Sequence, residues 1–192
     1  MQAQEIVIKI ARLHAFKIII GVRDIEEGNN LKAIIEQETL ICEHLCVFFE
    51  LDMTSYPSIE QFANNVQNAT ERVHAVLLYT DLHLESVEDE YGEITRSSHG
   101  TELQLQVNVL STAYLAIFFL PLLLETALAE GSPTHLEFVG CERYDHRNYA
   151  VLANFWEQSI LQHLNKYPED HFQYQATKFL QMGIMYVYSF VN

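Results

Sequence analysis

Four short apolar segments, separated by stretches with helical periodicity, constrain the fold of this chain more than any other feature. The segments are rich in branched and aromatic side chains, as in strands of a buried sheet, and cover residues 17–23, 46–51, 73–78 and 135–140. Helices are predicted for residues 3–14, 58–71, 101–129 and 149–166, and for segments that begin at residues 24 and 171. The alternation predicts one α/β domain over residues 1–192, with a parallel sheet flanked by helices.

Charge and cysteine content narrow the class of partner and the compartment. The chain has 26 acidic and 11 basic residues, a formal net charge of -15, which argues against nucleic acid and anionic membrane as partners. Its three cysteines, Cys42, Cys46 and Cys141, are an odd number without the spacing of a disulfide framework. They suit a reducing compartment, so we expect a cytoplasmic protein.

One apolar stretch, residues 109–124, has the composition of a membrane span. Its uninterrupted apolar part is 12 residues long and contains Pro121. A span requires roughly 20 residues, so the sequence predicts a buried helix.

Tyr174 and Lys178 are four residues apart in the last predicted helix, which places their side chains on one face. An ordinary phenol has a pKa of about 10, which is too high for efficient proton transfer at neutral pH. A neighbouring ammonium favours the phenolate and lowers the pKa of the phenol. The pair therefore predicts a general acid or base.

Five segments in order resemble the short-chain dehydrogenase/reductase family, in the branch common in fungal secondary-metabolite pathways. They cover residues 11–23, 50–53, 105–112, 136–141 and 174–178. The resemblance implies a Rossmann-like parallel sheet flanked by helices. It also implies an NADP-dependent alcohol/carbonyl oxidoreductase with a small-molecule substrate.

The same resemblance implies roles for four catalytic positions. Tyr174 would protonate or deprotonate the substrate oxygen, and Lys178 would lower the pKa of Tyr174 and hold the nicotinamide ribose. Asn108 would anchor a water relay. Cys141 stands where the family has a catalytic serine, and a thiol is a weak hydrogen-bond donor.

Two further positions would contact the nucleotide. Asp52 follows the second strand, where the family contacts adenine. Arg23 ends the first strand, where a basic residue would receive the 2′-phosphate of NADP; a surface charge beside a helix is the other interpretation.

The chain also departs from the family pattern. The opening strand, the Gly-rich loop that holds the pyrophosphate and the C-terminal strands are missing, and the seven glycines contain no G-x-x-x-G-x-G. The strands at 17–23 and 73–78 would then pair directly with each other, pair with a strand from another chain, or have unpaired edges. Tyr79-Thr80-Asp81 replaces an Asn-Ala-Gly turn, and the acidic loop from Asp81 to Glu93 is interpreted as solvated surface. Impaired cofactor binding is therefore expected.

Several alternatives remain open. The chain could be a non-redox descendant that acts as a scaffold or pairs with a full-length relative, or a cofactor-free acid/base catalyst. The helix at 101–129 makes a homodimer plausible, since the family dimerises through it. Cys42, His44 and Cys46 could supply metal ligands, but no second cluster completes a site, and we predict no metal. Cys141 could act as a nucleophile if His146 folds back onto it.

Overall fold

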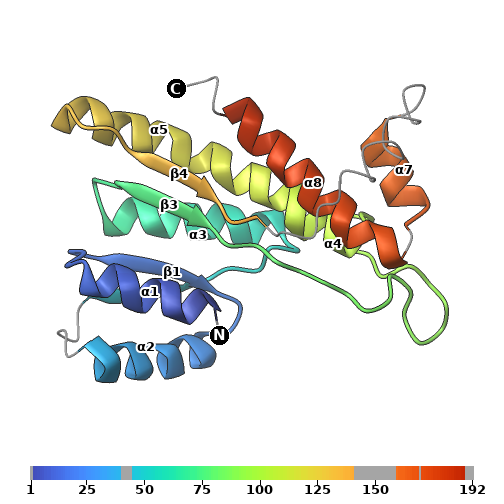
Figure 1. Ribbon diagram of the computed structural model, residues 1–192, viewed down its shortest axis with the longest axis horizontal. Helices are drawn as coiled ribbons and strands as arrows, with labels where there is room; N and C mark the ends of the chain where they lie inside the picture. Colours follow the sequence, from blue (N-terminus) through green and yellow to red (C-terminus); the bar gives the residue numbers. More distant parts are fainter. Residues whose placement is uncertain (1, 40–44, 141–158, 169, 189–192) are drawn as a thin grey trace. The chain divides into compact units, whose positions relative to one another are not determined.

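The computed structural model describes residues 2–39, 45–140, 159–168 and 170–188 (Figure 1). Contacts group these residues into two compact units. Unit 1 comprises Met1–Asp52 and Pro57–Thr70, and unit 2 comprises Met53–Tyr56 and Glu71–Asn192.

Two parallel strands form the centre of unit 1. β1 (Ile18–Val22) pairs with β2 (Cys46–Glu50), so that Ile18 lies opposite Cys46. α1 (Gln2–Arg12) and α2 (Ile25–Thr39) pack on one face, where Ala11, Ile35, Leu45 and Cys46 form a buried core with Phe48 beside them. α3 (Tyr56–Ala69) packs on the opposite face, because Phe49, the next residue after Phe48, contacts the ring of Phe62.

Two glycines of unit 1 allow close packing between its layers. A Cβ at Gly21 in β1 would lie 2.5 Å from the Leu51 side chain, and one at Gly28 in α2 would lie 3.1 Å from the Phe48 ring. Real Cβ contacts are longer than 3.0 Å, so a side chain at Gly21 would force Leu51 to move, and glycine is favoured at both positions. Both glycines therefore serve the core of unit 1.

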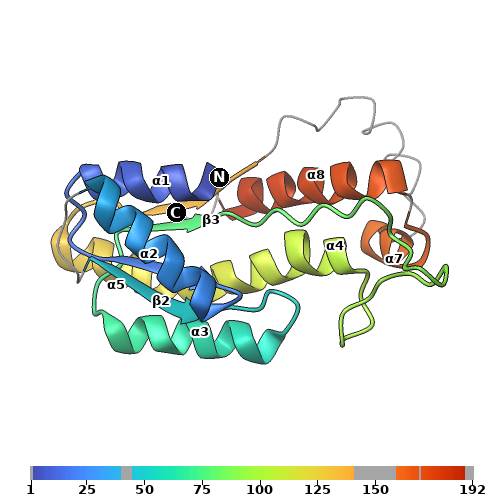
Figure 2. The ribbon, with the colours of Figure 1, turned by 90° about the horizontal axis from the view of Figure 1, so that it is seen from below.

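A second parallel pair lies in unit 2. β3 (Ala75–Leu78) pairs with β4 (His135–Phe138), and the Val73 amide donates to Thr126 Oγ1 at 3.0 Å. α8 (Asp170–Tyr188) runs beside the long helix of this unit, Leu103–Glu130, as Figures 1 and 2 both show. α7 (Ile160–Lys166) completes the helical core, in which Leu105, Val109, Leu164 and Ala176 are buried.

The long helix of unit 2 is continuous but not uniform. It consists of α4 (Leu103–Leu105), a π-helical segment η1 (Gln106–Ser111) and α5 (Thr112–Glu130). Gly131, with a φ of 62°, ends it in the left-handed conformation that glycine adopts without strain. By length and composition Leu103–Glu130 is the one helix of the described residues that could cross a membrane, and just over half of its most apolar window is buried in the protein.

The predicted fold class is confirmed: the strands are parallel and helices flank them. Within the described residues, β1 pairs with β2 in unit 1, and β3 pairs with β4 in unit 2. The helix expected from residue 58 begins at Tyr56 instead, because Pro57 fits a first helical turn, and the Ser58 hydroxyl accepts a hydrogen bond from the Asp52 amide at 2.9 Å. Residues 149–158 of another predicted helix lie outside the described residues.

Candidate active site

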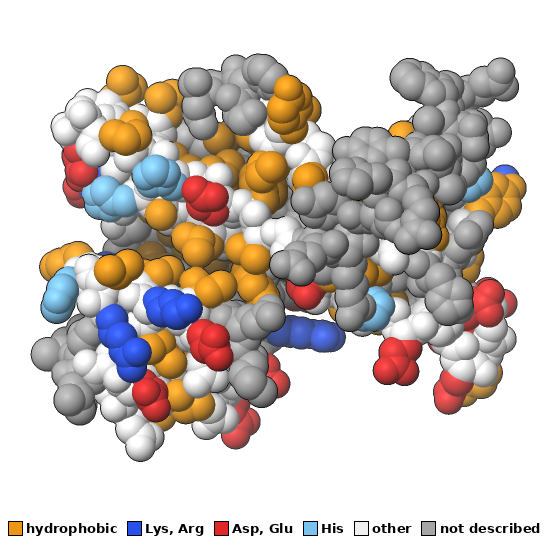
Figure 3. All heavy atoms as spheres, viewed as in Figure 1, with side chains coloured by type: hydrophobic (Ala, Val, Ile, Leu, Met, Phe, Trp, Pro, Cys, Tyr) orange, Lys and Arg blue, Asp and Glu red, His pale blue; other side chains and the backbone are white. Residues whose placement is uncertain are grey.

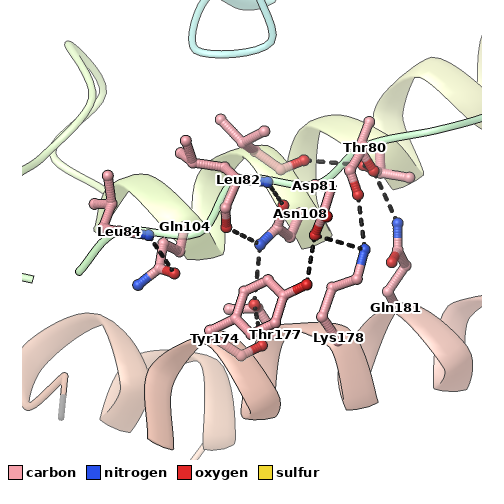
Figure 4. Close-up of polar contacts among 12 residues, drawn as sticks. Thr80, Asp81, Leu82, Leu84, Gln104, Asn108, Tyr174, Thr177, Lys178 and Gln181 are labelled. Carbon is pink, nitrogen blue, oxygen red and sulfur yellow. Dashed lines mark hydrogen bonds and ion pairs between the residues drawn. The ribbon is translucent and has the colours of Figure 1, made fainter. Parts of the chain in front are cut away.

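Tyr174 and Lys178 lie one turn apart on α8 and are almost fully buried, with 6% and 2% of their surfaces exposed. Both side chains point to the segment that follows β3 (Figure 4). The Lys178 ammonium donates to the Thr80 carbonyl oxygen at 2.7 Å. The α-helical spacing predicted from the sequence therefore does bring the phenol and the ammonium to one place.

Asp81 supplies a carboxylate to this place. The Tyr174 hydroxyl donates to Asp81 Oδ1 at 2.5 Å, the short distance typical of a hydroxyl bonded to an anion. The same oxygen lies 3.7 Å from Lys178 Nζ. The His83 ring lies over the Tyr174 ring, with 4.5 Å between their centroids. The site thus contains a phenol, an ammonium, a carboxylate and an imidazole.

Asn108 reaches the site from the long helix. Its amide oxygen accepts from the Leu82 amide at 2.8 Å, and its Nδ2 donates to the Leu82 carbonyl at 2.8 Å and to Thr177 Oγ1 at 3.1 Å. One side chain therefore bonds both backbone groups of Leu82 and a residue of α8. This arrangement fixes the segment after β3 between two helices, as Figure 4 shows.

The π-helical segment explains how Asn108 comes to face that strand end. Asn108 lies within η1, and Thr112 Oγ1 donates to the Val107 carbonyl at 2.9 Å. A π turn contains an additional residue, which shifts the direction of the side chains before it relative to those after it. Such turns occur frequently at functional sites, and this one contains the predicted relay residue.

Neutral side chains connect the strand end to α8 and to the long helix. Thr80 Oγ1 lies 2.7 Å from Thr112 Oγ1 and accepts a hydrogen bond from Gln181 Nε2 at 2.8 Å. Gln104 Oε1 accepts from the Leu84 amide at 3.2 Å. These bonds hold the residues around Tyr174 and Lys178 in fixed positions.

Arg23 and Asp52 lie at the carboxyl ends of the two paired strands of unit 1. Val22 pairs with Glu50, and the Leu51 amide donates to the Val22 carbonyl at 2.7 Å, so both positions fall at one sheet edge. Ligands of parallel α/β folds bind at this edge. Five of the 11 basic residues of the chain lie between Lys9 and Lys32, and Figure 3 shows basic side chains over the α1 and α2 part of unit 1.

Other predicted positions do not take part in the described site. Cys141, Cys42, His44 and His146 lie outside the described residues. Cys46 is a buried free thiol in β2. Among the described residues, no group of three or more His, Cys, Asp or Glu side chains is arranged to hold a metal ion.

Sequence analysis missed Asp81, Thr177 and Gln181 as site residues. Asp81 was interpreted as part of a solvated acidic loop, although it is the third residue after β3, at the edge where parallel sheets bind ligands. That position was the available signal. Thr177 and Gln181 lie three and seven residues after Tyr174, on the same helix face, and this spacing could have identified them.

No family model matches the sequence. The short-chain dehydrogenase/reductase ffsI of Aspergillus flavipes is 40% identical over 183 residues, which cover 94% of this chain and 51% of that protein. The short-chain dehydrogenase/reductase phmF of Phaeosphaeria nodorum is 40% identical over 179 residues, which cover 92% of this chain and 50% of that protein. The chain thus spans about half the length of these relatives.

A solved structure has the same fold. The crystal structure of a metagenomic short-chain oxidoreductase in complex with NADP gives a TM-score of 0.62 at 15% identity, over 96% of this chain and 68% of that one. This likeness concerns the fold, whereas the two fungal relatives carry the family assignment. The chain belongs to the short-chain dehydrogenase/reductase family.

Each unit, considered by itself, has side chains of the types that bind a group of a nicotinamide dinucleotide. In unit 2, Lys178 and Tyr174 offer donors and Asp81 an acceptor, which is the set that ribose hydroxyls require. In unit 1, Arg23 is exposed after β1, as a phosphate ligand requires. Gly21 and Gly28 pack in the core and do not form a pyrophosphate loop.

Proposed function

We propose that this chain carries the proton-transfer site of an NADP-linked oxidoreductase that interconverts alcohols and carbonyl compounds. The observation that supports it is the cluster in which Tyr174 and Lys178 of α8 meet Asn108 of the long helix at the end of β3. These are the residue types that the family uses, in one place. The family membership gives the reaction class.

In this proposal each residue has a defined task. Tyr174 gives its hydroxyl proton to the oxygen of a bound carbonyl compound, or takes a proton from an alcohol. Lys178 stabilises the phenolate that remains and binds the ribose. When bound, NADPH supplies the hydride that the carbonyl carbon receives. Asn108 keeps the strand end and α8 together, and Cys141 would occupy the position of the usual hydroxyl donor.

NADPH binding tests this proposal directly. Titration of the full chain with NADPH, followed by nicotinamide fluorescence and by thermal shift, should show saturable binding that Lys178→Met weakens about tenfold or more. Wild-type protein that shows neither signal at millimolar NADPH would reject the proposal. Impaired binding, expected because the Gly-rich loop is missing, would appear as a high dissociation constant.

Arg23 tests the choice between NADP and NAD. A charge-assisted bond to a phosphate is worth about 1.5–3 kcal/mol, so Arg23→Ala should weaken NADPH binding about 10- to 100-fold and leave NADH binding unchanged. Arg12→Ala is the matched control, since Arg12 is an exposed basic residue of the same unit that pairs with Glu38. Equal losses in both variants would show a general charge effect.

A second function, acid/base catalysis without a nucleotide, is favoured by one contact. The Tyr174 phenol already has a carboxylate partner in Asp81, so a proton donor and a proton acceptor are adjacent in the protein alone. Isomerisation or cyclisation of a small molecule would need no more than this. Product formation that persists without nucleotide and stops in Tyr174→Phe would support it.

The substrate class, partners and location complete the proposal. We propose a small molecule of fungal secondary metabolism, since the two relatives described above come from fungi. A homodimer, or a complex with a full-length relative, and a cytoplasmic location are further proposals. Light scattering of the purified chain measures its molecular mass in solution and so tests the homodimer.

A further inference from the structure

The Tyr174 phenol faces two opposite charges. Its hydroxyl donates directly to Asp81 at 2.5 Å, and the Lys178 ammonium lies 3.7 Å from the same carboxylate oxygen. A cation favours the phenolate and an anion favours the neutral phenol. The two neighbours therefore act on the proton of Tyr174 in opposite directions.

The hydrogen bonds show which of the two charged side chains, Asp81 or Lys178, contacts the Tyr174 hydroxyl. Lys178 donates to the Thr80 carbonyl at 2.7 Å, whereas Asp81 accepts the phenolic proton itself. Among the described residues, His83 is a further titratable group against the phenol, with its ring centroid 4.5 Å from that of Tyr174. Glu102 contacts the neighbouring residue, Gln173, on α8. Ionisation of the phenol would leave an anion directly against the Asp81 carboxylate, which is unfavourable.

We propose that Asp81 is a positioning residue that keeps the Tyr174 phenol protonated and bonded to the end of β3 until a ligand oxygen replaces the carboxylate. The inference about protonation concerns the unliganded protein. Only the identity of the displacing oxygen, that of a carbonyl or an alcohol, rests on the proposed function.

The exposure of Asp81 makes this displacement feasible. Its side chain is 47% exposed, so water can solvate the carboxylate when the phenol leaves. Lys178 Nζ, at 3.7 Å, can also move closer to it. In contrast to a buried carboxylate, Asp81 therefore loses little when its hydrogen bond to Tyr174 breaks.

The experiment is a pH titration of Tyr174 in the full chain without any nucleotide or substrate. Protein labelled with ¹³C at tyrosine Cζ gives one NMR signal per phenol, and the signal missing in Tyr174→Phe assigns Tyr174. In Asp81→Asn the titration midpoint of this phenol should be lower than in wild type by at least about one pH unit, a tenfold change in its ionisation constant. Circular dichroism at each pH shows where folding is lost.

Three further variants separate charge from shape. Asp81→Glu retains the anion and should keep the wild-type midpoint, whereas Asp81→Ser should lower it as Asp81→Asn does. Glu85→Gln removes an exposed carboxylate of the same loop and should have no effect. Equal midpoints in wild type, Asp81→Asn and Asp81→Ser, or phenols that stay protonated to the same unfolding pH, would overturn the inference. Failure of NADPH to bind would reject the proposed function and leave this result standing.

Discussion

Two neighbouring residues of α8 each donate a hydrogen bond to a carboxylate, and the two carboxylates differ in burial and in the number of donors that they accept. Gln173 donates to Glu102, whose side chain is fully buried and also accepts from the amides of Gln104 and Leu105. Tyr174 donates to Asp81, whose side chain is 47% exposed. Burial with three donors makes the first carboxylate structural. Exposure allows another acceptor to replace the second carboxylate at the Tyr174 hydroxyl, which a site that receives a ligand requires.

The largest effect expected from this comparison is on stability at Glu102. Glu102→Ala removes the cap of the long helix and leaves three buried donors without their acceptor, so the free energy of unfolding should fall by about 3 kcal/mol. Urea denaturation followed by circular dichroism measures it. Glu85→Ala, which removes an exposed carboxylate, should change stability by less than about 0.5 kcal/mol. Similar losses in both variants would contradict the structural role.

The second effect is on activity, at Tyr174. Tyr174→Phe removes one hydroxyl and keeps the ring, so turnover of carbonyl compounds with NADPH should fall about 10²-fold or more while the protein stays folded. Nicotinamide absorbance follows the reaction, and thermal unfolding checks the fold. Tyr186→Phe, in an exposed tyrosine of the same helix, is the matched control. Unchanged turnover in Tyr174→Phe would exclude the proposed proton donor.

Asp81 should show a smaller effect on stability. Asp81→Asn keeps the shape of the side chain and removes a half-exposed charge, so the free energy of unfolding should change by less than about 1 kcal/mol. The same urea experiment measures it beside Glu102→Ala. A loss as large as that of Glu102→Ala would mean that both carboxylates are structural, and the contrast between them would fail.

Cys46 in unit 1 tests whether burial of a titratable group contributes to stability outside the site. Burial, with a smaller contribution from the Glu36 charge, raises the pKa of the Cys46 thiol. In the unfolded chain the pKa of this thiol is about 8.5, so the unfolded state loses the thiol proton first as the pH rises. The stability that the neutral thiol contributes therefore decreases as the pH rises from that value through the pKa of the folded state. Unfolding measured from about pH 7 to 10 should show a small decrease, below about 1 kcal/mol, that Cys46→Ala removes.

Strands and the tyrosine–lysine pair were predictable from the sequence because both depend on local patterns. Ile18 to Val22 and Ala75 to Leu78 are apolar runs, and such runs are typical of strands in parallel α/β folds. Tyr174 and Lys178 share a helix face through their spacing alone. No tertiary information is needed for either conclusion.

Asp81 and the π turn could not be predicted, for different reasons. Asp81 and Tyr174 are 93 residues apart, so their contact depends on how β3 and α8 pack. The acidic residues after Asp81 gave the segment the composition of a solvated loop. The π segment at Gln106–Ser111 has the residue types of an ordinary helix, so its composition does not reveal the wider turn. α3 begins two residues before the predicted start at Ser58, because Pro57 fits the first helical turn and the Ser58 hydroxyl binds the Asp52 amide.

The wide turn at Gln106–Ser111 makes this site sensitive to a single codon. Loss of one residue from the segment would allow a regular α-helix, in which every residue is rotated by about 100° from the next. The part of the helix before α5 would then face a different direction, and Asn108 would no longer reach Leu82 and Thr177. A lineage could thus gain or lose this arrangement of side chains by one in-frame insertion or deletion, without any substitution at Tyr174 or Lys178.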